Sequence, residues 1–252
     1  MVTRKSCREI EKMRQAGRIV AEVLALVEGE LKPGVTTGHL DRLAERHIRA
    51  AGAVPSFKGY GHKSNPFPSS LCISIDNEVV HGIPGDRVIR DGQIVSVDAG
   101  AIFEGWHGDG ARTFVVGKPA QEIESLVEAT RLAMMAGIAA AVPGGHLGDI
   151  SAAIEDVAAP HGYGIVRQFV GHGIGTEMHQ EPQVPNYRTG VRGMKLAPGI
   201  CLAIEPMLTL GSHEVEVKPD GWTVVTSDGS LAAHFEHTIA VTENGPEILT
   251  SV

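Results

Sequence analysis

Four acidic side chains and one histidine interrupt segments that otherwise suit buried strands or glycine-rich turns. They are Asp98 in IVSVDAGAIF, Asp109 in HGDGARTFVV, His172 in FVGHGIG, Glu205 in CLAIEPML and Glu236 in AAHFEHTIAV. Burying an unpaired carboxylate is costly, and four together repel one another unless cations neutralise them. Two divalent ions would balance the four negative charges, so the pattern predicts a metal centre.

The chemistry of this ligand set narrows the choice of ion. It is rich in oxygen, with one nitrogen and no thiolate, which favours manganese, iron(II) or cobalt over a structural zinc, although zinc and nickel also accept such ligands. The alternative is that each acid pairs with an arginine or caps a turn, and for any single residue this is the better interpretation. Only Arg112 stands close in sequence to one of the acids, Asp109. The five residues together therefore favour the metal site, with tertiary partners left open.

Composition excludes several classes of protein. The chain has 252 residues, of which 42% are apolar and 21% charged, so it can bury a core as one large domain or two fused halves. Its net charge of -8 argues against a general nucleic-acid or anionic-membrane surface. Cys7, Cys72 and Cys201 show no paired-thiol spacing, and neither a signal peptide nor a membrane-spanning apolar run is apparent. We therefore expect a cytoplasmic protein in a reducing compartment.

Helix signals occur in two similar blocks. Ser6 and Glu9 have capping-box spacing ahead of an apolar run with three- and four-residue steps, which ends at Lys32-Pro33-Gly34. The helices expected from such periodicity and punctuation lie at about 6–31, 37–51, 122–142 and 149–159. Strand-like runs follow each block: LCISI, IVSVDAGAIF, ARTFVV, CLAIEPML, EVEV, WTVV and FEHTIAV.

The punctuation of the two blocks also repeats. Pro33, Gly34, Gly38 and Gly52 have counterparts 110 positions later at Pro143, Gly144, Gly148 and Gly162, and Gly59-Tyr60-Gly61 answers Gly171-His172-Gly173 at an offset of 112. Glycine and proline punctuate any fold, so an accidental match is the alternative. Because order and spacing agree over whole helix-turn-helix units, we infer a duplication: a single catalytic domain, 1–252, with halves of about 1–118 and 119–252.

Local sequence suggests how two of the candidate ligands approach each other. Asp98 and Asp109 flank EGWHG, which has the composition of a turn, so two antiparallel strands would bring both carboxylates to one face. His172 stands between two glycines, where the missing side chains let the backbone approach an ion or a substrate.

The motifs taken together resemble the methionine aminopeptidase family of pita-bread metallopeptidases. The resemblance covers nearly the whole chain and rests on NEVVHGIP, IVSVDAG, HGDGARTF, VGHGIGTEMHQEPQVPNY, AIEPM, DGWTVVTSDGS and HFEHTI. It implies an α+β pita-bread fold, in which helices cover an antiparallel sheet around an internal pseudo-two-fold repeat. Glu205 and Glu236 stand too close in sequence for the helical insertion of the family's second type, so the chain resembles type I.

The resemblance also implies a role for each site residue. Asp98 would chelate one ion, Asp109 and Glu236 would bridge both, and His172 with Glu205 would complete the other. His81, His179 and Glu205 would be catalytic, with His81 and His179 also binding substrate. The remaining substrate-binding residues, expected to line a pocket for the methionine side chain, are Tyr60, Phe67, Cys72 and Trp222.

Four other histidines are not assigned to the site, and the chain departs from the family pattern at two places. We read His47, His62, His213 and His234 as ordinary surface or core residues. The segment between Gly61 and Phe67 is longer than in the family, and Met178 stands where a bulky aromatic residue is common. Both departures are expected to alter the shape of the pocket more than its chemistry.

The resemblance implies removal of the N-terminal methionine from nascent proteins when the second residue is small. The cofactor would be two divalent ions per chain, and a hydroxide that bridges them would attack the first peptide bond. The partners would be nascent chains near the ribosome, and no nucleic acid or membrane would be bound. The protein would be a monomer. X-Pro peptidases of the same fold are the nearest alternative, but they generally have an additional N-terminal domain, and here the first helix begins near residue 6. A catalytically inactive binding protein is a second alternative, although such relatives typically lose metal ligands. A phosphate-binding loop at GHGIG is a third, and it lacks the downstream lysine.

Overall fold

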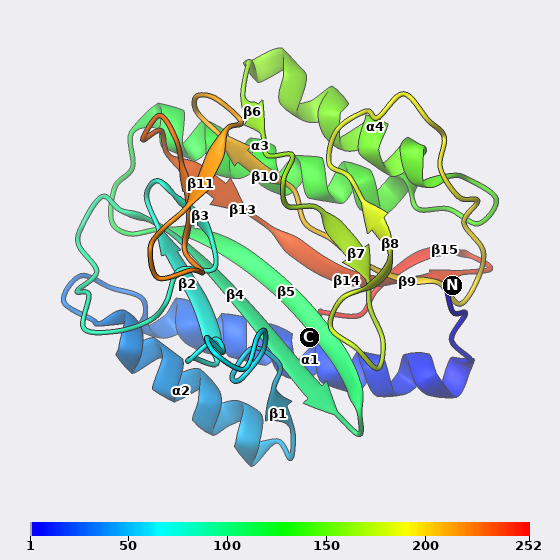
Figure 1. Cartoon of the computed structure of the whole chain (residues 1–252), viewed down its shortest axis with the longest axis horizontal. Helices are drawn as coiled ribbons and strands as arrows, with labels where there is room; N and C mark the ends of the chain where they lie inside the picture. Colours follow the sequence, from blue (N-terminus) through cyan, green and yellow to red (C-terminus); the bar gives the residue numbers. More distant parts are fainter. Residues whose placement is uncertain (1) are drawn as a thin grey trace.

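A curled antiparallel sheet with helices packed along it forms the α+β architecture of the chain (Figure 1). The structure is a computed structural model that describes residues 2–252. Its helices are α1 (Cys7–Glu30), α2 (Thr37–Ala50), α3 (Gln121–Ala140), α4 (Leu147–Ala158) and the 3₁₀ turn η1 (Ala159–His161). This class and the helix-covered antiparallel sheet confirm the predicted fold.

The strands form one large sheet and two small ones. The large sheet has the order β1 (Val54–Pro55), β4 (Ile94–Phe103), β5 (Trp106–Val115), β14 (Glu236–Thr242), β9 (Cys201–Ile204), β7 (Gly171–Gly173) and β8 (Gln180–Val184), with β2 (Leu71–Ile75) paired to β4 and β15 (Gly245–Ile248) to β14. The small sheets are β13 (Ala232–His234), β10 (Met207–Thr209) and β6 (Gly164–Ile165), and β11 (Val215–Val217), β12 (Val224–Thr226) and β3 (Glu78–Val80).

The first helix shows how local signals position an element against the sheet. Ser6 donates its backbone N–H to Glu9 Oε2 at 2.7 Å, and its hydroxyl accepts from the backbone N–H of Glu9, which confirms the capping box. The buried side of α1 crosses β4 and β5 (Figure 1). At Gly17 the backbones are so close that a Cβ atom would lie 2.4 Å from Leu249 O. Only glycine permits this contact.

The two helix-turn-helix blocks repeat in conformation as well as in sequence. The paired glycines Gly34 and Gly144 have φ angles of 95° and 89°, and Gly52 and Gly162 have 76° and 70°. Gly38 and Gly148 each approach a backbone carbonyl, where a Cβ would lie within 2.9 Å of oxygen. The match ends after the helices, because 171–173 form strand β7 of the large sheet whereas 59–61 lie in a loop. The exact division into halves remains a prediction.

Two expected boundaries were wrong. The turn assigned to EGWHG is shorter: only Glu104 and Gly105 turn, with φ angles of 47° and 80°, and Trp106 already belongs to β5. The run CLAIEPML is not one strand, because it breaks at Glu205-Pro206 into β9 and β10, which belong to different sheets. Proline has no N–H to donate to a ladder, and the break leaves Glu205 at the end of a strand.

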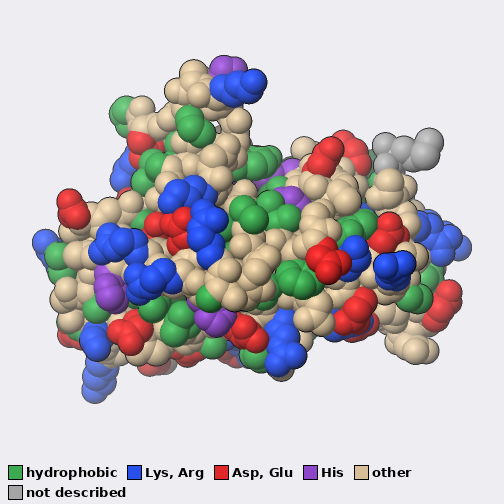
Figure 2. All heavy atoms as spheres, turned by 90° about the horizontal axis from the view of Figure 1, so that it is seen from below, with side chains coloured by type: hydrophobic (Ala, Val, Ile, Leu, Met, Phe, Trp, Pro, Cys, Tyr) green, Lys and Arg blue, Asp and Glu red, His purple; other side chains and the backbone are tan. Residues whose placement is uncertain are grey.

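Helix α4 begins earlier than expected. The predicted start at Asp149 is two residues inside the helix, since its carboxylate accepts the backbone N–H of His146 at 2.7 Å and so caps the first turn. None of the helices within residues 2–252 is both long and apolar enough to cross a membrane. Basic and acidic side chains alternate over the face of the molecule seen from below (Figure 2).

Candidate metal centre

Three of the predicted ligands share one face of the large sheet because of strand register. Asp98 on β4 lies opposite Ala111 of β5, and Gly100 lies opposite Asp109. Glu236 on β14 also lies opposite Ala111, from the other side of β5. Residues opposite each other, and those two positions apart on a strand, face the same way. Asp98, Asp109 and Glu236 therefore point to the same side of the sheet from three adjacent strands.

The other two ligands reach the same face from the second half of the chain. Thr238 on β14 lies opposite Ala203 of β9, and His172 on β7 lies opposite Ala203 on its other side. Thr238 is two residues from Glu236, and Glu205 is two residues from Ala203. By the same alternation, His172 and Glu205 face Glu236.

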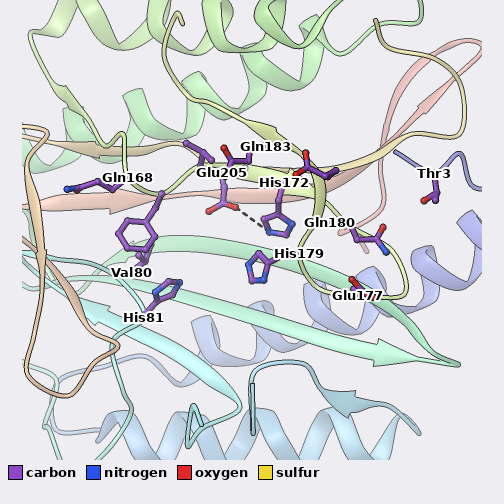
Figure 3. A pocket seen from close by; sticks show the side chains of 14 residues that line it. Thr3, Val80, His81, Gln168, His172, Glu177, His179, Gln180, Gln183 and Glu205 are labelled. Atoms are coloured by element: carbon purple, nitrogen blue, oxygen red, sulfur yellow. Dashed lines mark ion pairs between the residues drawn. The ribbon is translucent and has the colours of Figure 1, made fainter. Parts of the chain in front are cut away.

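Distances confirm that the side chains converge. His172 Nε2 lies 3.4 Å from Glu205 Oε1, the pair joined by the dashed line in Figure 3, and 3.8 Å from Asp109 Oδ2. Ligand atoms of Asp109, His172 and Glu236 all lie within 4.8 Å of one another, and all three residues are buried. The geometry suits a small cation.

The imidazole of His172 is held in the tautomer that a metal ion requires. Its Nδ1 is 2.9 Å from the carbonyl oxygen of Gly173, and because a carbonyl only accepts, Nδ1 carries the proton. Nε2 therefore presents its lone pair to the acids. Burial lowers the pKa of His172 to about 3, so the ring is neutral. Such a backbone contact to the second nitrogen is typical of metal-binding histidines.

The carboxylates lack other partners. Asp98 Oδ1, Asp109 Oδ1 and Glu236 Oε1 are buried, and within the described chain they have no hydrogen-bond partner. Burial, followed by the neighbouring carboxylates, raises the pKa of Asp109, Glu205 and Glu236 well above the usual range. Buried polar atoms are nearly always paired in proteins. Unpaired carboxylate oxygens beside an unprotonated nitrogen fit a divalent cation. The residues present therefore suit the predicted metal site.

All the predicted site residues line one small cavity of 90 Å³, the chamber. Its lining comprises the five ligands, the two histidines His81 and His179, and the apolar wall of Phe57, Tyr60, Phe67, Cys72 and Trp222. A larger cavity of 640 Å³, the cleft, adjoins it and shares His81, His172, His179 and Glu205 (Figure 3). The ligands and the apolar wall therefore share the chamber, and His172 and Glu205 also face the cleft.

Aromatic edges and a neutral thiol form the apolar wall. The Phe67 and Trp222 rings meet edge to face with centroids 5.2 Å apart, and Phe57 meets Phe67 at 6.5 Å. Cys72 lies on β2 opposite Asp98, and burial followed by the nearby carboxylates raises the pKa of its thiol, which keeps it protonated. The wall therefore offers apolar, polarisable contacts.

The longer segment after Gly61 does not displace the pocket residues. Gly59 donates its N–H to Phe67 O, and Phe67 donates its N–H to Tyr60 O, both at 2.8 Å. These two bonds close the base of the loop, so residues 61–66 project beyond it. The indole N–H of Trp222 donates to Asn65 O at 3.2 Å. The loop of residues 61–66 thus holds the indole of Trp222 in the apolar wall.

The two candidate catalytic histidines approach the ligands from separate loops. His81 follows β3 with a φ of 61°, a left-handed conformation that is uncommon outside glycine, and stacks edge-on against Phe169 at 5.5 Å. His179 directly precedes β8, and its ring centroid is 4.3 Å from that of His172. Figure 3 shows His179 between His172 and His81. Burial lowers the pKa of His81 to about 4 and lowers that of His179, so both rings are neutral.

Sequence reasoning missed three residues of this site. Phe57 lines the cavity, Phe169 packs on His81, and His234 is buried with Nε2 3.8 Å from Glu205 Oε2. The reading of His234 as an ordinary histidine overlooked this position. Their positions in the sequence could have indicated that two of them belong to the site, because Phe57 precedes the GYG motif and His234 stands two residues before Glu236.

Comparison with known proteins gives a consistent result. The model of Metallopeptidase family M24 matches residues 11–243. The chain is 53% identical to a methionine aminopeptidase of Clostridium acetobutylicum over 99% of both chains, and 47% identical to methionine aminopeptidase 1 of Bacillus subtilis over 100% of both. The crystal structure of a Thermotoga maritima methionine aminopeptidase superposes with a TM-score of 0.96 at 44% identity, over 100% of both chains. Prolidase from Pyrococcus furiosus, at 23% identity and a TM-score of 0.79 over 99% of this chain and 65% of that one, shares the fold.

Proposed function

The chain belongs to metallopeptidase family M24, and from this premise we propose how its residues remove the N-terminal methionine of a nascent polypeptide. It is a metal-dependent aminopeptidase, as its full-length similarity to curated methionine aminopeptidases shows. The observation that carries the mechanism is that the five metal ligands and an apolar wall line one small cavity, which shares His172 and Glu205 with the larger cleft. A peptide lying in the cleft could therefore place its first side chain against that wall.

We propose that two divalent ions would be held by Asp98, Asp109, His172, Glu205 and Glu236. Manganese, iron(II) or cobalt suits this donor set best. Such ions would lower the pKa of a coordinated water, which would supply the nucleophile near neutral pH, and would polarise the scissile carbonyl. The four carboxylates would balance the charge of both ions, and the neutral imidazole would add a nitrogen ligand.

Selection of methionine falls to the apolar chamber. A thioether packs favourably against aromatic edges, which Phe67 and Trp222 present, and Cys72 adds a second soft sulfur. The small volume of 90 Å³ favours one side chain beside the ligands. A small second residue would then fit in the narrow space beside the ligands. These features support removal of one residue from Met-Ala, Met-Gly and Met-Ser chains.

Three side chains would move or stabilise charge during hydrolysis. Glu205, ionised when the ions are bound, would take the proton of the attacking water and pass it to the leaving amine. His179, neutral and beside His172, would donate a hydrogen bond to the developing oxyanion. His81, on the opposite wall of the cleft, would contact the peptide and assist departure of the amine.

The cellular setting follows from the substrate. Nascent N-termini are available where chains emerge, so we propose that the enzyme acts in the cytoplasm near the ribosome, as a monomer with residues 1–252 forming a single catalytic domain. The three cysteines, which are free thiols in the structure, suit a reducing compartment. Sedimentation of the purified chain tests the oligomeric state.

Hydrolysis of short peptides tests the function directly. The chelated protein should be inactive, and added manganese, cobalt or iron(II) should restore release of methionine from Met-Ala-Ser. Met-Leu-Ser, with a bulky second residue, is the matched control and should be cut far more slowly. Cleavage of Ala-Pro instead would support an X-Pro peptidase, and no cleavage with any ion would support a binding protein.

A further inference from the structure

One contact in the site is not explained by lining a methionine pocket. The hydroxyl of Tyr60 lies 2.6 Å from Nδ1 of His179, the shortest contact that this hydroxyl makes, and the two ring centroids are 5.3 Å apart. A residue that merely lined the chamber would present its ring, as Phe67 does from the same loop. Tyr60 instead directs its polar end at a candidate catalytic side chain.

The chemistry of the two groups favours donation from the phenol to the ring nitrogen, whose role depends on the tautomer of His179. Burial, followed by the carboxylates of Asp109 and Glu177, raises the pKa of Tyr60, so the phenol keeps its proton. A neutral imidazole has one N–H and one lone pair. Among residues 2–252, Tyr60 is the side chain that meets His179 Nδ1, and no second acceptor meets the phenolic proton. If Tyr60 donates to Nδ1, the ring proton must reside on Nε2.

The proton on Nε2 determines what His179 can offer to a substrate in the neighbouring cleft. His179 lines both the chamber and the cleft, and because the Tyr60 hydroxyl occupies Nδ1, Nε2 is the ring nitrogen left for a substrate. Only a protonated Nε2 can donate to an oxyanion; with the proton on Nδ1, that edge would present a lone pair and repel negative charge.

The backbone around Tyr60 is held firmly enough to aim the hydroxyl. Tyr60 donates its own N–H to Phe57 O at 2.9 Å and accepts from Phe67 N at 2.8 Å. On the far side, Gly61 packs so closely on Trp222 that a Cβ atom would lie 2.5 Å from the indole ring. The loop therefore holds the backbone from which the phenol reaches His179.

We propose that Tyr60 is a positioning residue that, by donating its hydroxyl proton to His179 Nδ1, holds His179 in the tautomer that donates from Nε2 to the substrate. The inference rests on the proposed role of His179 at the oxyanion and adds the group that prepares it. It also assigns a function to the loop of residues 59–67, whose closed base keeps Tyr60 in place although the loop is long.

A double-mutant cycle with steady-state kinetics tests the inference. Tyr60→Phe keeps the aromatic ring in the wall and removes only the hydroxyl, so kcat for Met-Ala-Ser should fall about fivefold to tenfold with KM nearly unchanged. In a His179→Ala background the same change should have no further effect, because Tyr60 acts through His179. Lys63→Ala, on the exposed part of the same loop, is the control and should leave both constants unchanged.

Three kinetic results would overturn the proposal. They are an unchanged kcat in Tyr60→Phe, a rise in KM alone, which would indicate a lining role, and an equal loss of kcat with and without His179. If His179→Ala itself left kcat unchanged, the oxyanion role in the proposed function would fail.

A spectroscopic measurement tests the tautomer without relying on activity. In the metal-free protein with ¹⁵N-labelled histidine, the signals missing from His179→Ala identify this ring, and their long-range couplings report which nitrogen is protonated. We expect the Nε2–H form in the parent and a mixture or the Nδ1–H form in Tyr60→Phe. The Nδ1–H form in the parent, or the same spectrum in both proteins, would contradict the proposal.

Discussion

Replacing Asp109 by asparagine should separate the metal-dependent part of stability from the rest. Asp109 is central in the site, on β5 between Asp98 on β4 and Glu236 on β14, and its Oδ1 has no partner within residues 2–252. Asparagine keeps the shape of the side chain and removes one of four negative charges. The metal-free variant therefore loses no internal hydrogen bond at Oδ1 and should be at least as stable as the metal-free parent.

The magnitude follows from linkage between binding and folding. A ligand present at about 100 times its dissociation constant stabilises the folded state by about 2.7 kcal/mol. For a chain of this size each kcal/mol raises Tm by about 2–4 °C, so metal should raise the Tm of the parent by roughly 5–10 °C. In Asp109→Asn we expect most of that shift to disappear together with methionine release.

Thermal denaturation with chelator and with manganese measures both quantities, and Asp41→Asn is the matched control. Asp41 is an acid outside the site that accepts the backbone N–H groups of Ser70 and Leu71 at 2.8 and 2.9 Å. Its replacement should change Tm equally with and without metal and leave the metal-induced shift intact. A full metal-induced shift in Asp109→Asn, or a large loss of its metal-free stability, would refute the assignment of Asp109 as a shared ligand.

Four further substitutions test other parts of the structure. His179→Ala should lower kcat about 100-fold while bound metal, measured by elemental analysis, stays at the parental level; equal losses would show that it holds the metal. Trp222→Ala should raise KM for Met-Ala-Ser about tenfold or more by removing a wall of the chamber, and an unchanged KM would exclude that wall from substrate binding. Within α1, Gly29→Ala has open space and should stabilise the protein by about 1 kcal/mol. Gly17→Ala, in the same helix, places a Cβ 2.4 Å from Leu249 O and should lower the urea midpoint, the opposite sign.

The acidic ligands could be recognised in the sequence because they are charged residues within otherwise apolar segments. Asp98 stands in a ten-residue apolar strand, and the structure has that strand with the predicted bounds. An acid in such a run has to be explained by a partner, and this argument needs no knowledge of the fold. The helices were predictable for a similar reason, since capping and periodicity are properties of contiguous residues.

The register between the strands was harder to predict. The turn was placed over EGWHG, whereas the chain reverses at Glu104 and Gly105 with both φ angles positive. A non-glycine residue in the left-handed region is not apparent from its neighbours. The shorter turn is what sets Asp109 opposite Gly100. The position of Asp98 and Asp109 on the same face is therefore a consequence of this two-residue turn.

Contacts between distant segments were beyond local reasoning altogether. Phe169 meets His81 across the cleft, and His234 lies beside Glu205, although neither pair has any spacing that marks it. The hydroxyl of Tyr60 reaches a histidine 119 positions away. Such contacts depend on how the loops of both halves pack above the sheet, and a single sequence does not encode them in a readable pattern.

The metal centre lies where the two helix-strand blocks join, and the pairing there is short. β5 and β14 meet at Glu236 opposite Ala111 and at His237 opposite Gly110. Beside these pairs the hydroxyl of Thr238 accepts from Asp109 N at 3.0 Å and donates to Asp109 O at 2.8 Å. Since ligands come from both sides of this junction, bound ions would link the two blocks across it. Catalysis and cohesion of the domain would then depend on the same few carboxylates.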